Sequence, residues 1–134
     1  MLKILFISHG KLASGMKNSV DILVGNSDKL TIFDAYLDDN NVKNIIESFY
    51  STVNKDDQVI LLSDLYGGSV NQVMYLFLDR PNTMLVAGVN LALVLELAIK
   101  DSVTKFELEE IIEQSKSMLR LVKPDIEVTE EEFF

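Results

Sequence analysis

Residues 1–10 read MLKILFISHG, and this stretch decides the fold. Residues 2–8 form a nearly continuous apolar run rich in branched side chains, which is the pattern of a strand covered on both faces. Strands of this kind occupy the centre of a parallel sheet with helices on both faces. We therefore expect residues 2–8 to form a central strand, with His9, the only histidine of the chain, at its end.

Three more apolar runs of strand length follow, and segments with helical spacing of apolar residues separate them. The strict alternation of strand and helix predicts an α/β fold with an open, mostly parallel sheet of four strands and helices on both faces. The expected strands are 30–35 (LTIFDA), 58–63 (QVILLS) and 83–89 (TMLVAGV), and the expected helices are 16–24, 42–53, 69–78, 91–99 and 108–122.

Several helix ends carry recognisable capping residues. Gly25 is a stop signal for the first helix, and Asp39 and Asn40 are candidate N-caps of the second. Ser69 can cap the third helix, and Pro124 ends the last one.

The length and composition predict a single domain over residues 1–134. We expect an α/β core over 1–123 and a C-terminal strand and acidic tail over 124–134, in which 126–128 (IEV) would be the strand. The chain has no cysteine, and its apolar start is too short for a signal peptide. Nor does any stretch approach the roughly twenty apolar residues that cross a bilayer. A cytoplasmic location is the expectation.

The formal charge of −9 argues against nucleic acid as a partner, because phosphates would be repelled. An acidic surface can meet a basic patch on a protein partner, or it can simply keep the protein soluble. Both interpretations stay open.

The predicted site lies outside the carboxyl ends of the strands, where ligands bind in open α/β sheets. His9 follows the first strand, and Asp64, Gly67, Gly68 and Ser69 follow the third. If these two strands are neighbours, all five residues share one crevice. Alone, a histidine here is as well explained as a structural residue, and glycine-glycine-serine as a tight turn with a capping serine.

Together these residues suggest phosphoryl chemistry. A carboxylate such as Asp64 can fix the imidazole tautomer and leave the other ring nitrogen of His9 as a nucleophile. Two glycines allow close approach of the backbone, and the turn from Gly67 to Ser69 offers donors to an anion. We expect no metal and no cofactor, because one histidine without cysteines cannot make the common zinc sets.

Three segments, SHGKLASG, DLYGGSVNQ and AGVNLALVLEL, follow the first, third and fourth expected strands. On the basis of these three segments, residues 1–123 resemble the enzyme IIA component of the mannose-family sugar phosphotransferase system (PTS). The family often has threonine in place of Ser8, and proline in place of Val70 and of Ala92. Each is a mild departure outside the expected chemistry.

The resemblance implies a phosphotransferase that accepts a phosphoryl group on His9 from the phosphocarrier protein HPr and passes it to a PTS IIB protein. It assigns Asp64 to orient the imidazole, and Gly67, Gly68 and Ser69 to bind the phosphoryl group. IIB would be a separate protein, and the membrane components IIC and IID would be met only indirectly. The resemblance also implies a homodimer that exchanges the short C-terminal strand.

Three other interpretations remain. The phosphocarrier subunit of a dihydroxyacetone kinase system shares the fold and a histidine after the first strand. A tetrapyrrole metal chelatase also has histidine-glycine before a loop, although it usually draws on further histidines. A flavodoxin-like or receiver-like binding module would not need His9 at all.

Overall fold

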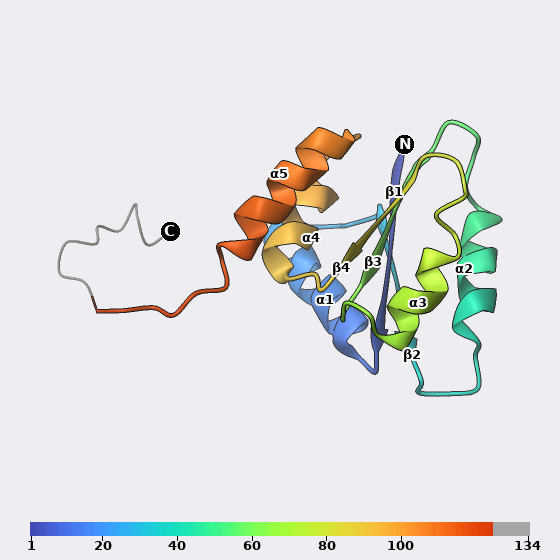
Figure 1. Cartoon of the computed structure of the whole chain (residues 1–134), viewed down its shortest axis with the longest axis horizontal. Helices are drawn as coiled ribbons and strands as arrows, with labels where there is room; N and C mark the ends of the chain where they lie inside the picture. Colours follow the sequence, from blue (N-terminus) through green and yellow to red (C-terminus); the bar gives the residue numbers. More distant parts are fainter. Residues whose placement is uncertain (125–134) are drawn as a thin grey trace.

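The computed structural model describes residues 1–124, and a four-stranded parallel sheet forms its centre (Figure 1). The strands lie in the order β2-β1-β3-β4, and all three pairings are parallel. The α/β fold with an open parallel sheet is therefore confirmed. The strands are β1 (Leu2–His9), β2 (Leu30–Ala35), β3 (Gln58–Ser63) and β4 (Thr83–Ala87).

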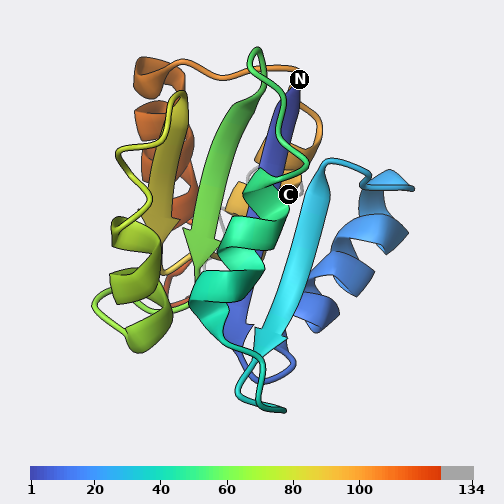
Figure 2. The ribbon, with the colours of Figure 1, turned by 90° about the vertical axis from the view of Figure 1, so that its right-hand side faces the viewer.

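Helices cover both faces of the sheet, as the two views of the ribbon show (Figures 1 and 2). One face carries α1 (Leu12–Val24), α4 (Leu91–Ala98) and α5 (Lys105–Lys116). The other carries α2 (Val42–Tyr50) and α3 (Ser69–Tyr75). The core is accordingly split into two apolar layers with the sheet between them.

Strand β1 supplies side chains to both layers. Ile4 and Phe6 pack in the layer under α1, α4 and α5, whereas Leu5 and Ile7 pack in the layer under α2 and α3. Each of the four is at most 1% exposed. Full burial of one such side chain contributes about 1.5–3 kcal/mol to the stability of the fold. The continuous apolar run of β1 therefore stabilises both layers of the core.

Several helix ends differ from the sequence expectation: α1 and α5 begin earlier, at Leu12 and Lys105, and α2 and α3 end earlier, at Tyr50 and Tyr75. The N-cap of α2 is Asn41, whose side chain accepts the amide N–H of Lys43, and neither Asp39 nor Asn40 takes that place. The N-cap of α3 is Gly68, so Ser69 is the first helical residue and makes no capping bond. Helix α5 ends at Lys116 rather than near residue 122. There the Ser117 hydroxyl donates to the Gln114 carbonyl, and such local bonds compete with helix continuation.

Strand β4 ends at Ala87, two residues before the expected end. Gly88 has a φ of 72°, which turns the chain out of the sheet, and its N–H donates to the Ser63 carbonyl. The strand expected at residues 126–128 lies outside the described residues. Between residues 1 and 124, no helix is both long and apolar enough to cross a membrane.

Candidate functional site

The strand order reverses direction between β1 and β3, and the carboxyl ends of these two strands lie side by side. These strands are hydrogen-bonded neighbours, with Ile7 opposite Ser63. The chain leaves β1 through α1 on one face toward β2, and leaves β3 through α3 on the other face toward β4. Two neighbouring crossovers that diverge in this way leave open space at the sheet edge. His9 and Asp64 lie at that edge.

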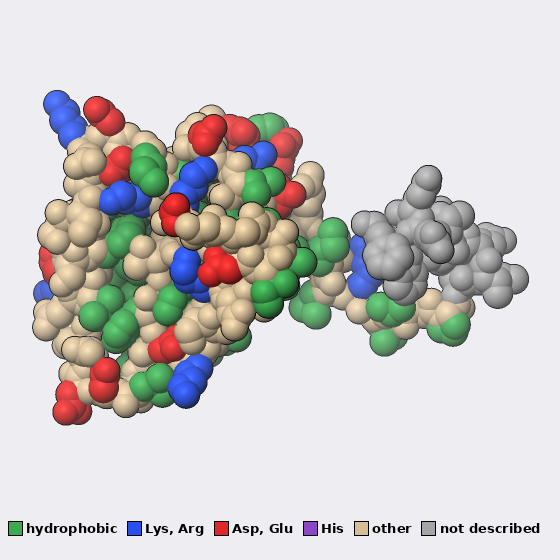
Figure 3. Space-filling model, turned by 180° about the vertical axis from the view of Figure 1, so that it is seen from behind, with side chains coloured by type: hydrophobic (Ala, Val, Ile, Leu, Met, Phe, Trp, Pro, Cys, Tyr) green, Lys and Arg blue, Asp and Glu red, His purple; other side chains and the backbone are tan. Residues whose placement is uncertain are grey.

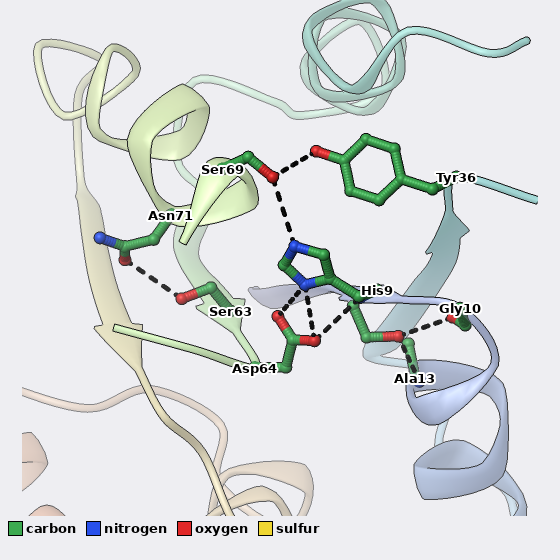
Figure 4. Close-up of polar contacts among 9 residues, drawn as sticks. His9, Gly10, Ala13, Tyr36, Ser63, Asp64, Ser69 and Asn71 are labelled. Carbon is green, nitrogen blue, oxygen red and sulfur yellow. Dashed lines mark hydrogen bonds and ion pairs between the residues drawn. The ribbon is translucent and has the colours of Figure 1, made fainter. Parts of the chain in front are cut away.

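The Asp64 carboxylate holds the imidazole of His9 (Figure 4). The Nδ1 atom of His9 lies 3.0 Å from Oδ2 and 3.1 Å from Oδ1 of Asp64. The Asp64 side chain is 10% exposed and the His9 side chain 41%. A carboxylate accepts but does not donate, so Nδ1 carries the proton in the neutral ring. Nε2 is then left with a lone pair.

The Nε2 atom of His9 faces the start of α3, where the hydroxyl of Ser69 lies 3.3 Å away. A third side chain completes the group, because the Tyr36 hydroxyl lies 2.6 Å from the Ser69 hydroxyl. The rings of His9 and Tyr36 are 5.2 Å apart between centroids and inclined by 40°. The Nε2 atom of His9 therefore faces the Ser69 hydroxyl, which in turn contacts the Tyr36 hydroxyl.

Buried hydrogen bonds fix the loop that follows His9. The Ser8 hydroxyl is fully buried, donates to the Gly10 carbonyl at 3.0 Å and accepts the Ala13 N–H at 2.7 Å. Gly10 has a φ of 62°, and its N–H donates to the Ala35 carbonyl at 2.9 Å. These bonds tie the ends of β1 and β2 together and set the backbone of His9.

The turn between Asp64 and α3 approaches the imidazole closely. A Cβ atom on Gly68 would lie 3.2 Å from the Leu65 carbonyl oxygen and 3.5 Å from Cε1 of His9. Gly67 has a φ of 76°, which favours glycine. The Gly68 N–H donates to the Leu65 carbonyl at 3.1 Å, which closes the turn. Gly68 contributes space next to the imidazole.

The structure brings together His9, Asp64, Gly68 and Ser69, with Gly67 in the same turn. Sequence reasoning missed Tyr36. The available signal was its position, because it directly follows β2 and therefore lies at the same edge of the sheet as His9. In residues 1–124, no three histidine, cysteine, aspartate or glutamate side chains gather closely enough to hold a metal ion.

Comparison with known proteins gives a consistent result. Residues 3–116 match the model of a protein family described as the PTS system fructose IIA component. Among curated proteins, no relative matches the chain.

Solved structures agree with the family match. A candidate phosphoenolpyruvate-dependent sugar PTS permease from Klebsiella pneumoniae is 28% identical, with a TM-score of 0.80 and 90% of each chain covered. A PTS IIA protein associated with the fucose utilization operon of Streptococcus pneumoniae is 30% identical, with a TM-score of 0.73 over 90% of this chain and 92% of that one.

A third structure supports the fold alone. The mannose/sorbose-specific IIA subunit from Enterococcus faecalis is 22% identical, with a TM-score of 0.77 over 95% of this chain and 98% of that one. The sheet and its five helices therefore have the same arrangement as in that subunit.

Proposed function

This chain belongs to the family of PTS fructose IIA components, and we propose that it carries a phosphoryl group on the Nε2 atom of His9. Family membership supports a phosphoryl carrier role in sugar transport. The observation that carries the residue assignment is the orientation of the imidazole. Asp64 engages Nδ1, and Nε2 remains as the nucleophilic nitrogen in front of the Ser69 hydroxyl.

In the proposed reaction, the donor is the histidine-phosphorylated carrier protein HPr. The lone pair of Nε2 attacks phosphorus, a new N–P bond forms on His9, and the N–P bond of the donor breaks with its electron pair returning to the donor imidazole. The Nδ1 proton of His9 stays in place. The ring then holds a positive charge, which the Asp64 carboxylate at 3.0 Å balances.

The Ser69 hydroxyl is the proposed donor to the transferred group. It lies 3.3 Å from Nε2, and a phosphoryl group on that atom would bring oxygens within its reach. Gly67 and Gly68 would allow these oxygens close to the backbone, because neither has a side chain in the way. Donors that face a developing negative charge in a fixed position lower the barrier to transfer.

Transfer onward follows the same chemistry in reverse. An imidazole of a PTS IIB protein would attack the phosphorus on His9, and the His9 ring would return to its neutral form. The membrane components IIC and IID would be only indirect partners of this chain, through IIB. No metal or cofactor enters either step.

The surface around the site suits protein partners. Large hydrophobic side chains at the carboxyl edge of the sheet are between 51% and 84% exposed. Exposed apolar groups around a small reactive centre are typical of a site that meets another macromolecule. These residues are Leu12, Tyr36, Leu37, Leu65 and Tyr66.

We also propose that the protein is a homodimer. Hydrophobic side chains lie along the segment that leads from the body of the molecule toward the grey atoms in Figure 3. Met118, Leu119, Leu121 and Val122 are 65–87% exposed there. A second copy of the chain would cover them. The molar mass in solution, measured by light scattering, tests this: a monomer at micromolar concentration contradicts it.

The carrier role is tested by intact mass after incubation with phosphoenolpyruvate, enzyme I and HPr. We expect one acid-labile phosphoryl group on the wild-type protein and none on His9→Gln, because glutamine has no nucleophilic ring nitrogen. Circular dichroism should show the same fold for both. Phosphorylation of His9→Gln would place the group elsewhere, and no adduct on either protein would contradict the proposal.

A further inference from the structure

Tyr36 has a backbone conformation that side chains of its size rarely adopt. Its φ is 68°, in the left-handed region. Among residues 1–124, the other non-glycine residue with positive φ is Asn82, of a type that tolerates it. The Tyr36 side chain is also 54% exposed, so packing alone does not explain the position. A strained residue at the edge of a site motivates a search for its function.

The strain has a geometric consequence. Ala35 is fully buried and is the register partner of His9, and its carbonyl accepts the Gly10 N–H. The backbone is therefore fixed one residue before Tyr36. In the left-handed conformation that follows, the Tyr36 side chain points to the start of α3 and brings its hydroxyl within 2.6 Å of Ser69 (Figure 4).

The hydrogen bonds in this group can be assigned a direction. Asp64 accepts the Nδ1 proton of His9, so Nε2 has only a lone pair to offer. Ser69 must then use its single hydroxyl proton toward Nε2. Its oxygen can still accept, and the proton between Tyr36 and Ser69 therefore comes from the tyrosine. The sequence of donors runs from Tyr36 to Ser69 to His9.

We propose that Tyr36 is a positioning residue for phosphoryl transfer, which acts through the Ser69 hydroxyl. This inference rests on the proposed function of His9. When Nε2 is free, the tyrosine keeps the serine proton pointed at it. When Nε2 carries the phosphoryl group, the tyrosine still donates to the serine oxygen, and the serine proton turns to a phosphoryl oxygen. Tyr36 itself gives up no proton.

The pair of hydroxyls would favour the phosphorylated state. A hydroxyl that accepts one hydrogen bond becomes a better donor in the next, because the bonds polarise one another. The short contact between Tyr36 and Ser69 should thus strengthen the bond from Ser69 to the phosphoryl group. Loss of the tyrosine hydroxyl should both slow acceptance and shorten the lifetime of the phosphohistidine.

The experiment compares Tyr36→Phe, Ser69→Ala and the double variant, each loaded with phospho-HPr. Two quantities are measured: the rate of phosphoryl acceptance by rapid quench, and the half-life of the isolated phosphoprotein at neutral pH. We expect Tyr36→Phe to lower both by about fivefold, the loss typical of one hydrogen bond. Tyr75→Phe, which removes a hydroxyl from a similarly exposed tyrosine on α3, serves as the matched control and should change neither.

The double variant distinguishes a positioning role from a general one. If Tyr36 acts through Ser69, Tyr36→Phe should have no further effect once Ser69 is alanine. A full effect in that background, or wild-type values for Tyr36→Phe alone, would overturn the inference. Phenylalanine keeps the ring, and matching thermal melts of the variants would show that the fold is retained. Wild-type protein that accepts no phosphoryl group would instead contradict the carrier role itself.

Discussion

Oδ2 of Asp64 accepts two hydrogen bonds from the same residue, one from Nδ1 of His9 at 3.0 Å and one from the His9 backbone N–H at 2.8 Å. One carboxylate therefore fixes both the backbone position of His9 and the rotation of its ring. Because Asp64 follows β3 and His9 ends β1, these bonds also join the two strands at the edge where the site lies.

For Asp64→Asn we expect slower phosphoryl transfer and a lower stability. The amide keeps an acceptor but loses the charge that balances the phosphorylated ring, so the acceptance rate should fall by about a hundredfold. The weakened bonds to His9 should reduce the free energy of unfolding by about 1–2 kcal/mol. Rapid-quench kinetics with phospho-HPr and urea denaturation measure the two effects. A wild-type transfer rate would remove Asp64 from the mechanism.

Gly68→Ala should impair the site. Its Cβ would lie 3.2 Å from the Leu65 carbonyl oxygen and 3.5 Å from Cε1 of His9, so the turn or the imidazole must move by a few tenths of an ångström. We expect phosphoryl acceptance to fall about tenfold, since misplacement of the reacting atoms raises the barrier. The same kinetic assay measures it.

Gly15→Ala is the matched control for Gly68→Ala. Gly15 lies within α1, and a Cβ there meets no atom within 4 Å. Alanine in a helix is favoured over glycine, and we expect the free energy of unfolding to rise by about 0.5–1 kcal/mol. Transfer should be unchanged. Equal activity of Gly68→Ala and Gly15→Ala would show that close approach at Gly68 is unimportant.

Tyr36→Asn should separate stability from activity. Asparagine tolerates the left-handed conformation, so relief of strain should raise the free energy of unfolding by about 1 kcal/mol. The variant also loses the hydroxyl that contacts Ser69, and transfer should slow. Thermal melts and quench kinetics test both effects. A lower melting temperature would indicate that the tyrosine is retained for packing.

Asp57 should make stability depend on pH in the acid range. The Asn54 N–H donates to its carboxylate at 2.8 Å, and the N-terminal ammonium lies 3.3 Å away. The Asn54 bond first, then the ammonium and Lys3, lower the pKa of Asp57, while burial opposes them. The folded pKa thus lies below the unfolded one. The stabilisation is present above the unfolded pKa, near 3.9, and is lost as the pH falls through the folded value.

For Asp57→Asn we expect a lower urea midpoint at pH 7 and a shallower decline of that midpoint between pH 5 and pH 3. Asp56→Asn is the control, because Asp56 is the exposed neighbour of the buried Asp57. Its midpoint should match that of the wild type across the range. The same acid decline in Asp57→Asn as in the wild type would exclude this carboxylate as the cause.

The sequence alone was enough to predict the four strands of the sheet and the fold class. A central parallel strand is buried on both faces, so its apolar run is nearly continuous. The ends of the strand can then be recognised in the sequence where the run stops. The bounds of β2 and β3 were predicted to the residue, and His9 was placed at the end of β1. Helix ends were less predictable, because a cap depends on which of several polar residues meets the free amides. Asn41 took that place for α2, where its neighbours Asp39 and Asn40 were expected.

The tertiary structure decided what the site contains. The strand order β2-β1-β3-β4 makes β1 and β3 neighbours and so brings Asp64 to His9. The Tyr36 side chain points toward Ser69 from a backbone with a φ of 68°, and the Gly10 N–H, from a distant part of the chain, holds the Ala35 carbonyl just before it. The Gly68 amide is engaged by a turn whose geometry no local pattern specifies. Strands can be predicted from local patterns of burial. The side chains around His9, in contrast, are placed by contacts between segments that lie far apart in the sequence.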